Sequence, residues 1–295
     1  MWVVCGLLMP FQSRESYFAL RALNVELASI KDGGGLLYDQ RRKGKDTSNV
    51  ALKLRMQWWN DSIFTLSSSS GNSNPIVRSM HRAIQESNFT IRFLQRLMEA
   101  RSMDLDCTQY STMNDLIQYS HDTHSSLLYL QLECCSGDVD EQVDIIANHI
   151  GIGLGIVTTI RSIVYRASIM GEIAIPNDLL QQYDVSHSDF FQIINHEGTE
   201  KEVKLKGAVQ QMAQLAHSYL NEARKHQDKL PKNDKRIALL PAVIGFHYLH
   251  QLQHTYQYDV LYPQKQANRN NTLSSPMEQL KFTMLLGRAY LTGIF

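Results

Sequence analysis

The sequence lacks an excess of charge of either sign, because 29 Lys and Arg residues balance 29 Asp and Glu residues over 295 residues. This balance provides no basic footprint for nucleic acid, and no nucleic-acid partner is expected. The four cysteines, Cys5, Cys107, Cys134 and Cys135, include no Cys-x-x-Cys pair. That spacing offers no disulfide framework and favours a reducing compartment.

Signals for β-strands and for familiar catalytic sites are also missing. No run of alternating β-branched residues predicts a strand, and no internal repeat occurs. The chain has no Gly-x-Ser-x-Gly, no Walker loop and no Cys/His nucleophile signature. Gly151, Gly153 and Gly155 are spaced at two residues but follow no strand, so they form no dinucleotide fingerprint.

The first nine residues are apolar, but they have no basic start and no small-residue cleavage site, so they make a poor signal peptide. They also differ from an Arg- and Ser-rich mitochondrial presequence, and no presequence is evident.

What is present is helical periodicity. It predicts an all-α chain with a single domain over residues 1–295. The expected helices cover 17–31, a segment from 48 or 49 to 64, 76–86, 90–103, 113–133, a segment starting at 145, 184–190, 209–225, 239–254 and 277–295. Residues 67–74 are expected to form a flexible loop within the domain, followed by Pro75 at the first position of a helix.

The segment 145–178 is the most apolar in the chain. Apolar residues on most of its faces predict a buried central helix, in which the three glycines let a neighbouring backbone approach closely. Asn148, His149 and Arg161 interrupt the roughly 20-residue apolar run that a membrane span requires.

Helix ends follow from local signals. Glycines 33–35 are expected to end the helix 17–31, and Ser48 or Asn49 is expected to cap the next one. The basic run 41–45 between these helices is expected to be solvated surface.

Two polar clusters invite a functional interpretation. The acidic group Asp138, Asp140, Glu141 and Asp144 is expected to complement the N-terminus of the central helix. The histidines His247, His250 and His254 share one helix face but have no Cys or carboxylate to complete a zinc site, so packing is the preferred interpretation, as it is for His121 and His124.

Two segments resemble the signatures of squalene and phytoene synthases. In that family an Ala-Phe helix leads to Asp-Asp-x-x-Asp, and these acidic positions fall on Ala28, Ser29 and Asp32. A second, glycine-containing helix carries Arg-Asp and Glu-Asp pairs before a Leu-Pro-x-Asp turn. Here Arg161 and the turn 175–178 are retained, while the acidic positions fall on Ser162, Tyr165 and Arg166.

The resemblance implies an isoprenoid-synthase-like helical bundle that has lost its Mg²⁺ ligands. Ionising an allylic diphosphate requires Mg²⁺ held by carboxylates on facing helices, which Ala, Ser and Tyr cannot replace. We therefore expect a pseudoenzyme with no catalytic residues, no metal and no cofactor. The candidate pocket or partner-surface residues are Arg21, Asn24, Glu26 and Arg161.

Further segments are similar to one branch of this family whose members assist the assembly of mitochondrial respiratory complex I. These segments are 17–30, 55–59, 125–130, 149–151, 155–158 and 258–260. The resemblance implies a protein of the mitochondrial matrix, peripheral to the inner membrane, with complex I subunits or other assembly factors as partners. A lipid or prenyl chain is a further expected ligand.

Two alternatives stay open at this stage. One is an active prenyltransferase that recruits Asp32, Asp104, Asp106 and Asp122 to hold Mg²⁺. The other is a helical adaptor whose cavity is filled.

Overall fold

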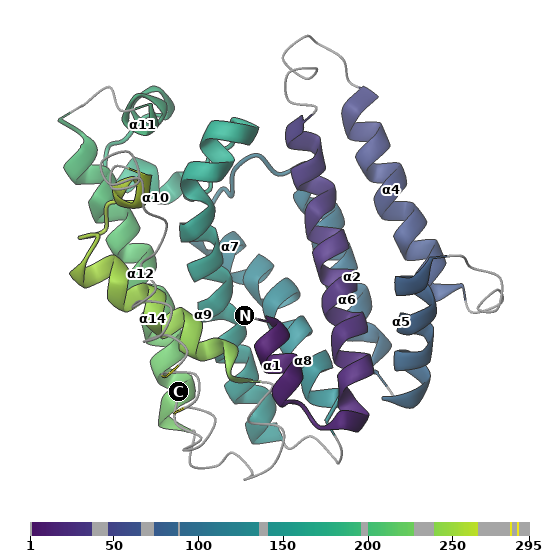
Figure 1. The fold of residues 1–295 in the computed structure, drawn as a ribbon. Helices are drawn as coiled ribbons and strands as arrows, with labels where there is room; N and C mark the ends of the chain where they lie inside the picture. Colours follow the sequence, from purple (N-terminus) through teal and green to yellow (C-terminus); the bar gives the residue numbers. More distant parts are fainter. Residues whose placement is uncertain are drawn as a thin grey trace.

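A computed structural model describes residues 2–36, 47–65, 74–87, 89–135, 141–195, 200–226 and 239–264, together with Met284 and Arg288. Every regular element in these ranges is helical, which confirms the all-α prediction (Figure 1). The elements are α1 (Trp2–Leu8), α2 (Phe11–Leu36), α4 (Thr47–Phe64), α5 (Pro75–Glu86), α6 (Ile91–Asp104), α7 (Met113–Ser120), η2 (His121–Ser125), α8 (Ser126–Glu133), α9 (Glu141–Tyr165), η3 (Arg166–Met170), α10 (Asn177–Gln182), α11 (His187–Ile194), α12 (Glu202–Lys225) and α14 (Pro241–His254).

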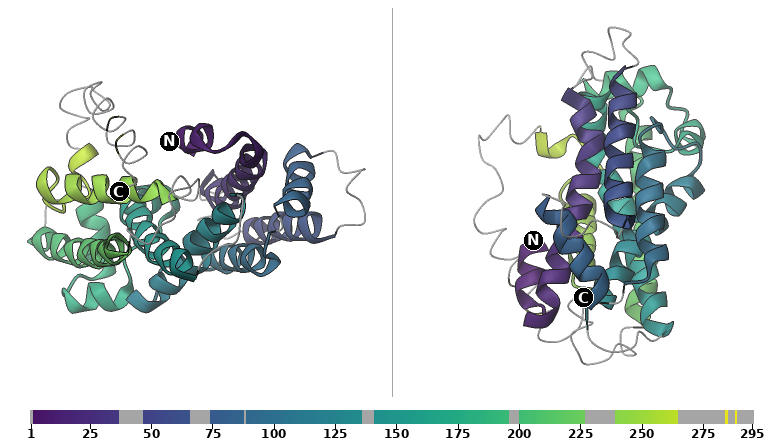
Figure 2. Two further views of the ribbon diagram at one scale, coloured as in Figure 1. Left: turned by 90° about the horizontal axis from the view of Figure 1, so that it is seen from below. Right: turned by 90° about the vertical axis from the view of Figure 1, so that its right-hand side faces the viewer.

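Helix α9 lies at the centre of the bundle, as its apolar sequence predicts. It packs against α12 and α14 on one side and against α7 and η2 on the other. Figure 2 shows α4 and α5 at one edge of the molecule, with α12 and α14 at the opposite edge. The continuous segment Glu141–Met170 is long and apolar enough to cross a membrane, with a mean hydropathy of 1.6, but 72% of that window is buried inside the protein. Burial within the bundle accounts for this apolar composition.

Glycines bring α9 close to its neighbour. A Cβ on Gly151 would lie 2.5 Å from the backbone N and Cα of Ser125, and one on Gly155 would collide with the Ser120 side chain. These contacts confirm the expected close approach of helix backbones. They fix α9 against the rod formed by α7, η2 and α8.

That rod corresponds to the single helix expected over 113–133, but it contains a π-helical turn, η2, at its middle. A second π-helical turn, η3, extends α9 to Met170, where Gly171 adopts a left-handed conformation with φ 66° and ends the helix. Such turns are frequent where helices carry functional residues. Both of them contribute residues to the cavity described below.

Several predicted boundaries are wrong. Helix α2 begins at Phe11 and not at 17, and α12 begins at Glu202 and not at 209. Helix α2 continues through glycines 33–35 to Leu36, because the preference of glycine for helix ends is weak enough for its surroundings to override. Helix α4 already begins at Thr47, so Ser48 and Asn49 lie inside its first turn. The short helix expected from Asp184 begins at His187, where Ser186 and Asp189 form a capping box.

Other expectations hold or lie outside the described residues. Pro75 occupies the first turn of α5, and the Asn74 side chain caps it by accepting hydrogen bonds from the Ile76 and Val77 amides. The central helix begins at Glu141 and not at 145, so Glu141 and Asp144 lie inside its first turn, where they complement the helix N-terminus, and not ahead of it. The basic run 41–45, most of the loop 67–74, residues 138–140 and nearly all of the segment 277–295 fall outside the described ranges.

Candidate functional site

A cavity of about 410 Å³ lies among α2, α6, α7, η2, α8, α9 and η3. Both segments that resemble synthase signatures contribute to its wall. Most of the candidate positions identified in the sequence meet there: Arg21, Asn24, Ala28, Asp32, Arg161, Ser162, Tyr165 and Arg166. The fold thus brings together two signature segments that lie about 130 residues apart in the sequence.

Two candidate positions face elsewhere. The Ser29 hydroxyl donates a hydrogen bond to the backbone carbonyl of Glu26, 2.8 Å away. The Glu26 carboxylate forms an ion pair with Arg55 of α4 at 3.1 Å. Glu26 is thus part of the surface between α2 and α4 and does not line the cavity.

A buried network of four charges closes one end of the cavity. The Lys31 ammonium lies 3.2 Å from both Asp104 and Glu172. The Arg166 guanidinium lies 2.7 Å from Glu172 and 3.8 Å from Asp104. All four side chains are nearly inaccessible to solvent, and two cations balance two carboxylates. Burial lowers the pKa of Arg166, but the fields of Asp104 and Glu172 outweigh this and raise its pKa above the usual value.

Backbone and tyrosine groups complete the network. Lys31 also donates to the backbone carbonyls of Asp104 and Cys107, at 2.6 and 2.7 Å. Tyr110 and Tyr119 donate to the two oxygens of Asp104, at 3.2 and 3.4 Å. The carboxylate of Asp104 is therefore satisfied by protein groups on every side. This arrangement ties α2, α6, α7 and η3 together where the signatures converge.

Two further arginines face the cavity with no carboxylate partner within 4 Å among the described residues: Arg101 and Arg161. Arg101 donates to the Tyr119 hydroxyl at 2.8 Å, and the Arg161 guanidinium lies 5.6 Å from the centre of the Tyr248 ring. Asp32 is exposed at the edge of the cavity, and partial desolvation raises its pKa against the opposing fields of Arg101 and Arg166. The wall between these groups thus carries an excess of positive charge.

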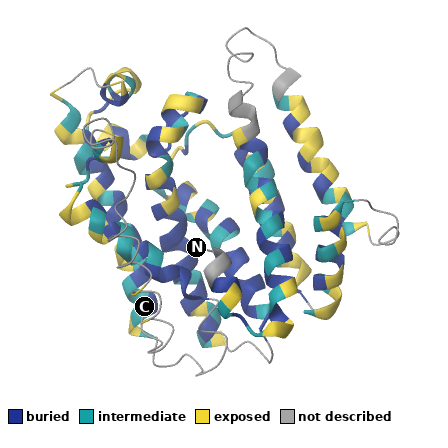
Figure 3. Cartoon of the chain, in the orientation of Figure 1, coloured by how far each residue is buried: buried dark blue, intermediate teal, exposed yellow. Residues whose placement is uncertain are grey.

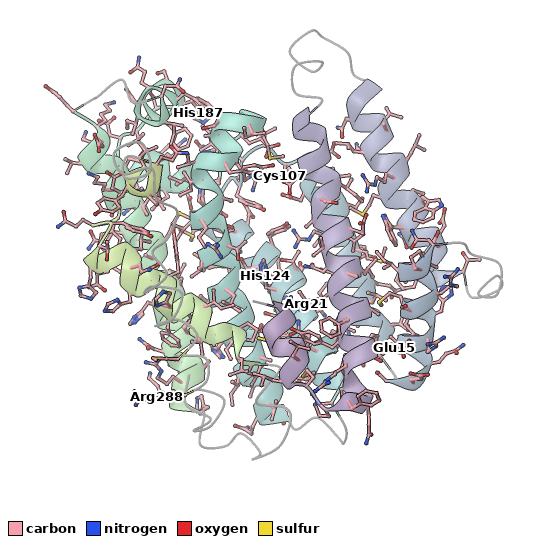
Figure 4. The ribbon with its side chains drawn as sticks, viewed as in Figure 1. Glu15, Arg21, Cys107, His124, His187 and Arg288 are labelled. Atoms are coloured by element: carbon pink, nitrogen blue, oxygen red, sulfur yellow. The ribbon has the colours of Figure 1, made fainter. Side chains whose placement is uncertain are left out.

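His124 and Arg21 lie at the centre of the molecule (Figure 4), towards the other end of the cavity, where Leu127, Leu128 and Leu154 supply an apolar wall. Burial lowers the pKa of His124 to about 3, with smaller contributions from Arg101 and Arg21. Burial likewise lowers the pKa of Arg21 to about 10. Since His124 is neutral at physiological pH and Arg21 is charged, this end of the cavity is apolar with a single fixed cation.

The residues present do not fit a magnesium cluster. Of the four acids that an active synthase would recruit, Asp32 and Asp104 line the cavity, and Asp104 is engaged by Lys31. Asp106 pairs with Lys53 at 2.8 Å, and Asp122 lies by His121 and Arg96, all outside the cavity. Among the described residues no three His, Cys, Asp or Glu side chains are grouped to hold a metal ion. The histidines of α14 lie outside the cavity.

A second cavity, of about 440 Å³, adjoins the first. It lies between α9 with η3 and the segment from α14 to Gln264. Arg161 and Tyr165 line both cavities. Most of its other lining residues are apolar or aromatic: Ile160, Val164, Ile169, Tyr248, Tyr256, Val260 and Pro263.

Comparison with known proteins agrees with this geometry. The family model for squalene/phytoene synthase matches residues 3–271. The chain belongs to the squalene/phytoene synthase family. The fold is shared with a dehydrosqualene synthase, at a TM-score of 0.69 and 16% identity over 99% of this chain and 92% of that one. It is also shared with a squalene synthase from Alicyclobacillus acidocaldarius, at a TM-score of 0.59 and 17% identity over 86% and 98% of the two chains. These likenesses confirm the isoprenoid-synthase-like bundle.

Several relatives that are similar in sequence are named as assembly factors and not as synthases. The chain is 33% identical over 270 residues to NADH dehydrogenase (ubiquinone) complex I, assembly factor 6, of Bos taurus, which covers 92% of this chain and 74% of the relative. The protein of that name in Homo sapiens is 31% identical over the same shares. The Drosophila melanogaster homologue is 30% identical over 85% of this chain and 70% of the relative.

Sequence reasoning missed several residues of the site. Lys31 could have been found, because its spacing from Arg21, Asn24 and Ala28 places it on the same face of α2. Arg101 and Glu172 lie close to motif positions in the sequence, but neither falls on a position of the signatures described above. The sequence favours packing for His124, whereas the structure places it in the wall of the cavity, where burial lowers its pKa.

Proposed function

We propose that this chain is a non-catalytic member of the family that acts in the assembly of mitochondrial complex I. The buried network carries the proposal: Arg166, at a position where the synthase signature has an acid, neutralises Glu172 from inside the protein. The Lys31 ammonium lies 3.2 Å from both Asp104 and Glu172, so these acids are paired with cations and are not left free to hold a metal. The names of the sequence relatives support the role in assembly.

The proposed site of action is the mitochondrial matrix, with peripheral contact to the inner membrane. The proposed partners are complex I subunits or other assembly factors. Surface residues such as Glu26 and Arg55, which pair across α2 and α4, are candidates for contact with these partners.

The test is depletion of the protein in its own cells, followed by native gel electrophoresis of the respiratory complexes. We expect a specific loss of assembled complex I that the wild-type chain restores. The Asp32→Asn variant should restore it equally, because this carboxylate has no metal to bind in the proposed function. Normal complex I after depletion would refute the assembly role, and failure of Asp32→Asn alone would favour an active enzyme.

The cavity supports a second, compatible proposal: it binds an anionic amphiphile, such as a prenyl diphosphate or a phospholipid, without a metal. Arg101 and Arg161 form no ion pair within 4 Å with a described carboxylate, and Leu127, Leu128 and Leu154 supply an apolar wall. Guanidinium groups bind phosphate oxygens in a bidentate geometry.

Thermal unfolding with farnesyl diphosphate, or with a short-chain phosphatidic acid, tests this binding. A ligand at about 100 times its dissociation constant should stabilise the fold by roughly 2.7 kcal/mol. The stabilisation should fall in Arg161→Gln and be retained in Arg55→Gln, which changes an arginine outside the cavity. An equal shift in both variants would place the ligand elsewhere, and no shift would favour a scaffold with a filled cavity.

A further inference from the structure

Two histidine rings lie side by side at the C-terminal end of α14. His250 and His254 are four residues apart on the helix, and their ring centres lie 4.4 Å apart at an interplanar angle of 42°. Both side chains are exposed, whereas Leu249 and Leu252, on the other side of the helix, are buried. Figure 3 shows this end of α14 at the outer edge of the bundle. The pair therefore faces outward and does not pack into the core.

The ring nitrogens of this pair are not engaged by the rest of the described protein. Within the described ranges, neither His250 nor His254 forms a hydrogen bond or an ion pair, and each contacts the other. Two exposed histidines of the neighbouring helices differ in this respect. The Nδ1 atom of His217 accepts a hydrogen bond from the Asn221 amide at 3.0 Å, and Nδ1 of His149 donates to the Ile145 carbonyl at 2.8 Å. The pair on α14 thus keeps its nitrogens available to a ligand.

Two imidazoles at this spacing have the geometry of a metal chelate. Histidines at i and i+4 on one helix face are the arrangement that holds zinc in His-x-x-x-His helices. A zinc–nitrogen bond is about 2.0–2.1 Å long, so two ligands of one tetrahedral ion lie about 3.4 Å apart. Rings with centres 4.4 Å apart can bring one nitrogen each to this separation by rotating about their side-chain bonds. Neutral imidazole binds Zn²⁺, Ni²⁺ and Cu²⁺, whereas Mg²⁺ and Ca²⁺ prefer oxygen ligands.

The position of the pair within the helix also favours a cation. His254 is the last residue of α14, and the partial negative charge at a helix C-terminus attracts positive charge to its last turn. No group of three His, Cys, Asp or Glu side chains suited to a metal occurs in the described part of the chain. An ion held by His250 and His254 would therefore keep its remaining coordination positions for water or for a ligand from outside the protein.

We propose that His250 and His254 form a bidentate surface site for a divalent transition-metal ion. The order of affinities for imidazole ligands predicts that Cu²⁺ binds more tightly than Ni²⁺ or Zn²⁺. Neither histidine lines either cavity. The site is thus separate from the cavity proposed to bind an anionic amphiphile, and it goes beyond the proposed role in complex I assembly.

Calorimetric titration of the full chain with copper(II) chloride and with zinc chloride tests the proposal. Loss of a group that only supports a metal ligand costs about 10–100-fold in affinity, so loss of a ligand should cost at least about tenfold. We therefore expect His250→Gln and His254→Gln each to bind Cu²⁺ at least about tenfold more weakly than the wild type. Because both side chains are exposed, the circular dichroism of the variants should be unchanged. His217→Gln, which changes a single exposed histidine of α12, is the matched control and should bind as the wild type does.

Electron paramagnetic resonance of the Cu²⁺-bound chain adds a readout of the ligands themselves. With one equivalent of Cu²⁺, the wild type and His217→Gln should show coupling to two imidazoles, and His250→Gln should show coupling to one. No binding of Cu²⁺, a single coupled imidazole in the wild type, or equal affinity of the wild type and the double variant His250→Gln/His254→Gln would overturn the proposal. Both measurements use the purified chain, so their outcome does not depend on whether the protein acts in complex I assembly.

Discussion

Removing one cation from the buried network should destabilise the fold substantially. Arg166→Met would leave Asp104 and Glu172 with Lys31 as their shared cation, and thus one buried carboxylate without compensation. Breaking a buried pair in this way costs about 3–5 kcal/mol. Because Lys31 stays within 3.2 Å of both carboxylates, we expect a loss of about 3 kcal/mol, at the lower end of this range.

Urea unfolding followed by circular dichroism measures this loss. The control is Arg55→Met, which breaks the half-exposed ion pair with Glu26 and should cost less than about 1 kcal/mol. Adding Glu172→Gln to Arg166→Met removes the surplus negative charge, so the double variant should lose less than the sum of the two single variants, by at least about 1 kcal/mol. Strict additivity, or an equal cost for Arg166→Met and Arg55→Met, would refute the reasoning.

Three further predictions concern stability. Burial lowers the pKa of His124 to about 3 in the folded state, whereas its ordinary pKa is about 6.5. Unfolding therefore takes up a proton between these two values, and the free energy of unfolding should fall as the pH drops from about 6.5 to about 3. Acid unfolding of His124→Gln should lack this contribution. Gly151→Ala should lower the free energy of unfolding by about 1–3 kcal/mol because its Cβ meets the backbone of Ser125, and an unchanged urea midpoint would contradict this. Ser186→Ala removes the cap of α11 and should cost about 1 kcal/mol by thermal unfolding, a value that would be near zero if the capping box contributed nothing.

The sequence predicted the all-α class of the fold and its central buried helix for a physical reason. Long apolar periodicity identifies a buried helix such as α9 without knowledge of its neighbours. The two signature segments are each local patterns, and the resemblance places both on facing helices; Ala28 and Ser162 both line the cavity between those helices.

The sequence could not predict how the charges combine. Arg166 pairs with Glu172 only because η3 and the left-handed Gly171 turn the chain back, and Lys31 meets Asp104 across 73 residues. The prediction that α2 ends at glycines 33–35 is wrong for a related reason, because these residues favour a helix end locally but α2 continues to Leu36. Local propensity is too weak to determine such details against tertiary contacts.

The most direct test of the central claim is whether Mg²⁺ changes the binding of farnesyl diphosphate to the purified chain, followed by thermal unfolding. A non-catalytic protein with Arg166 and Lys31 in place of a metal should show the same stabilisation, or the same lack of it, with and without Mg²⁺. A stabilisation that requires Mg²⁺, accompanied by release of pyrophosphate, would contradict the account and identify an active prenyltransferase.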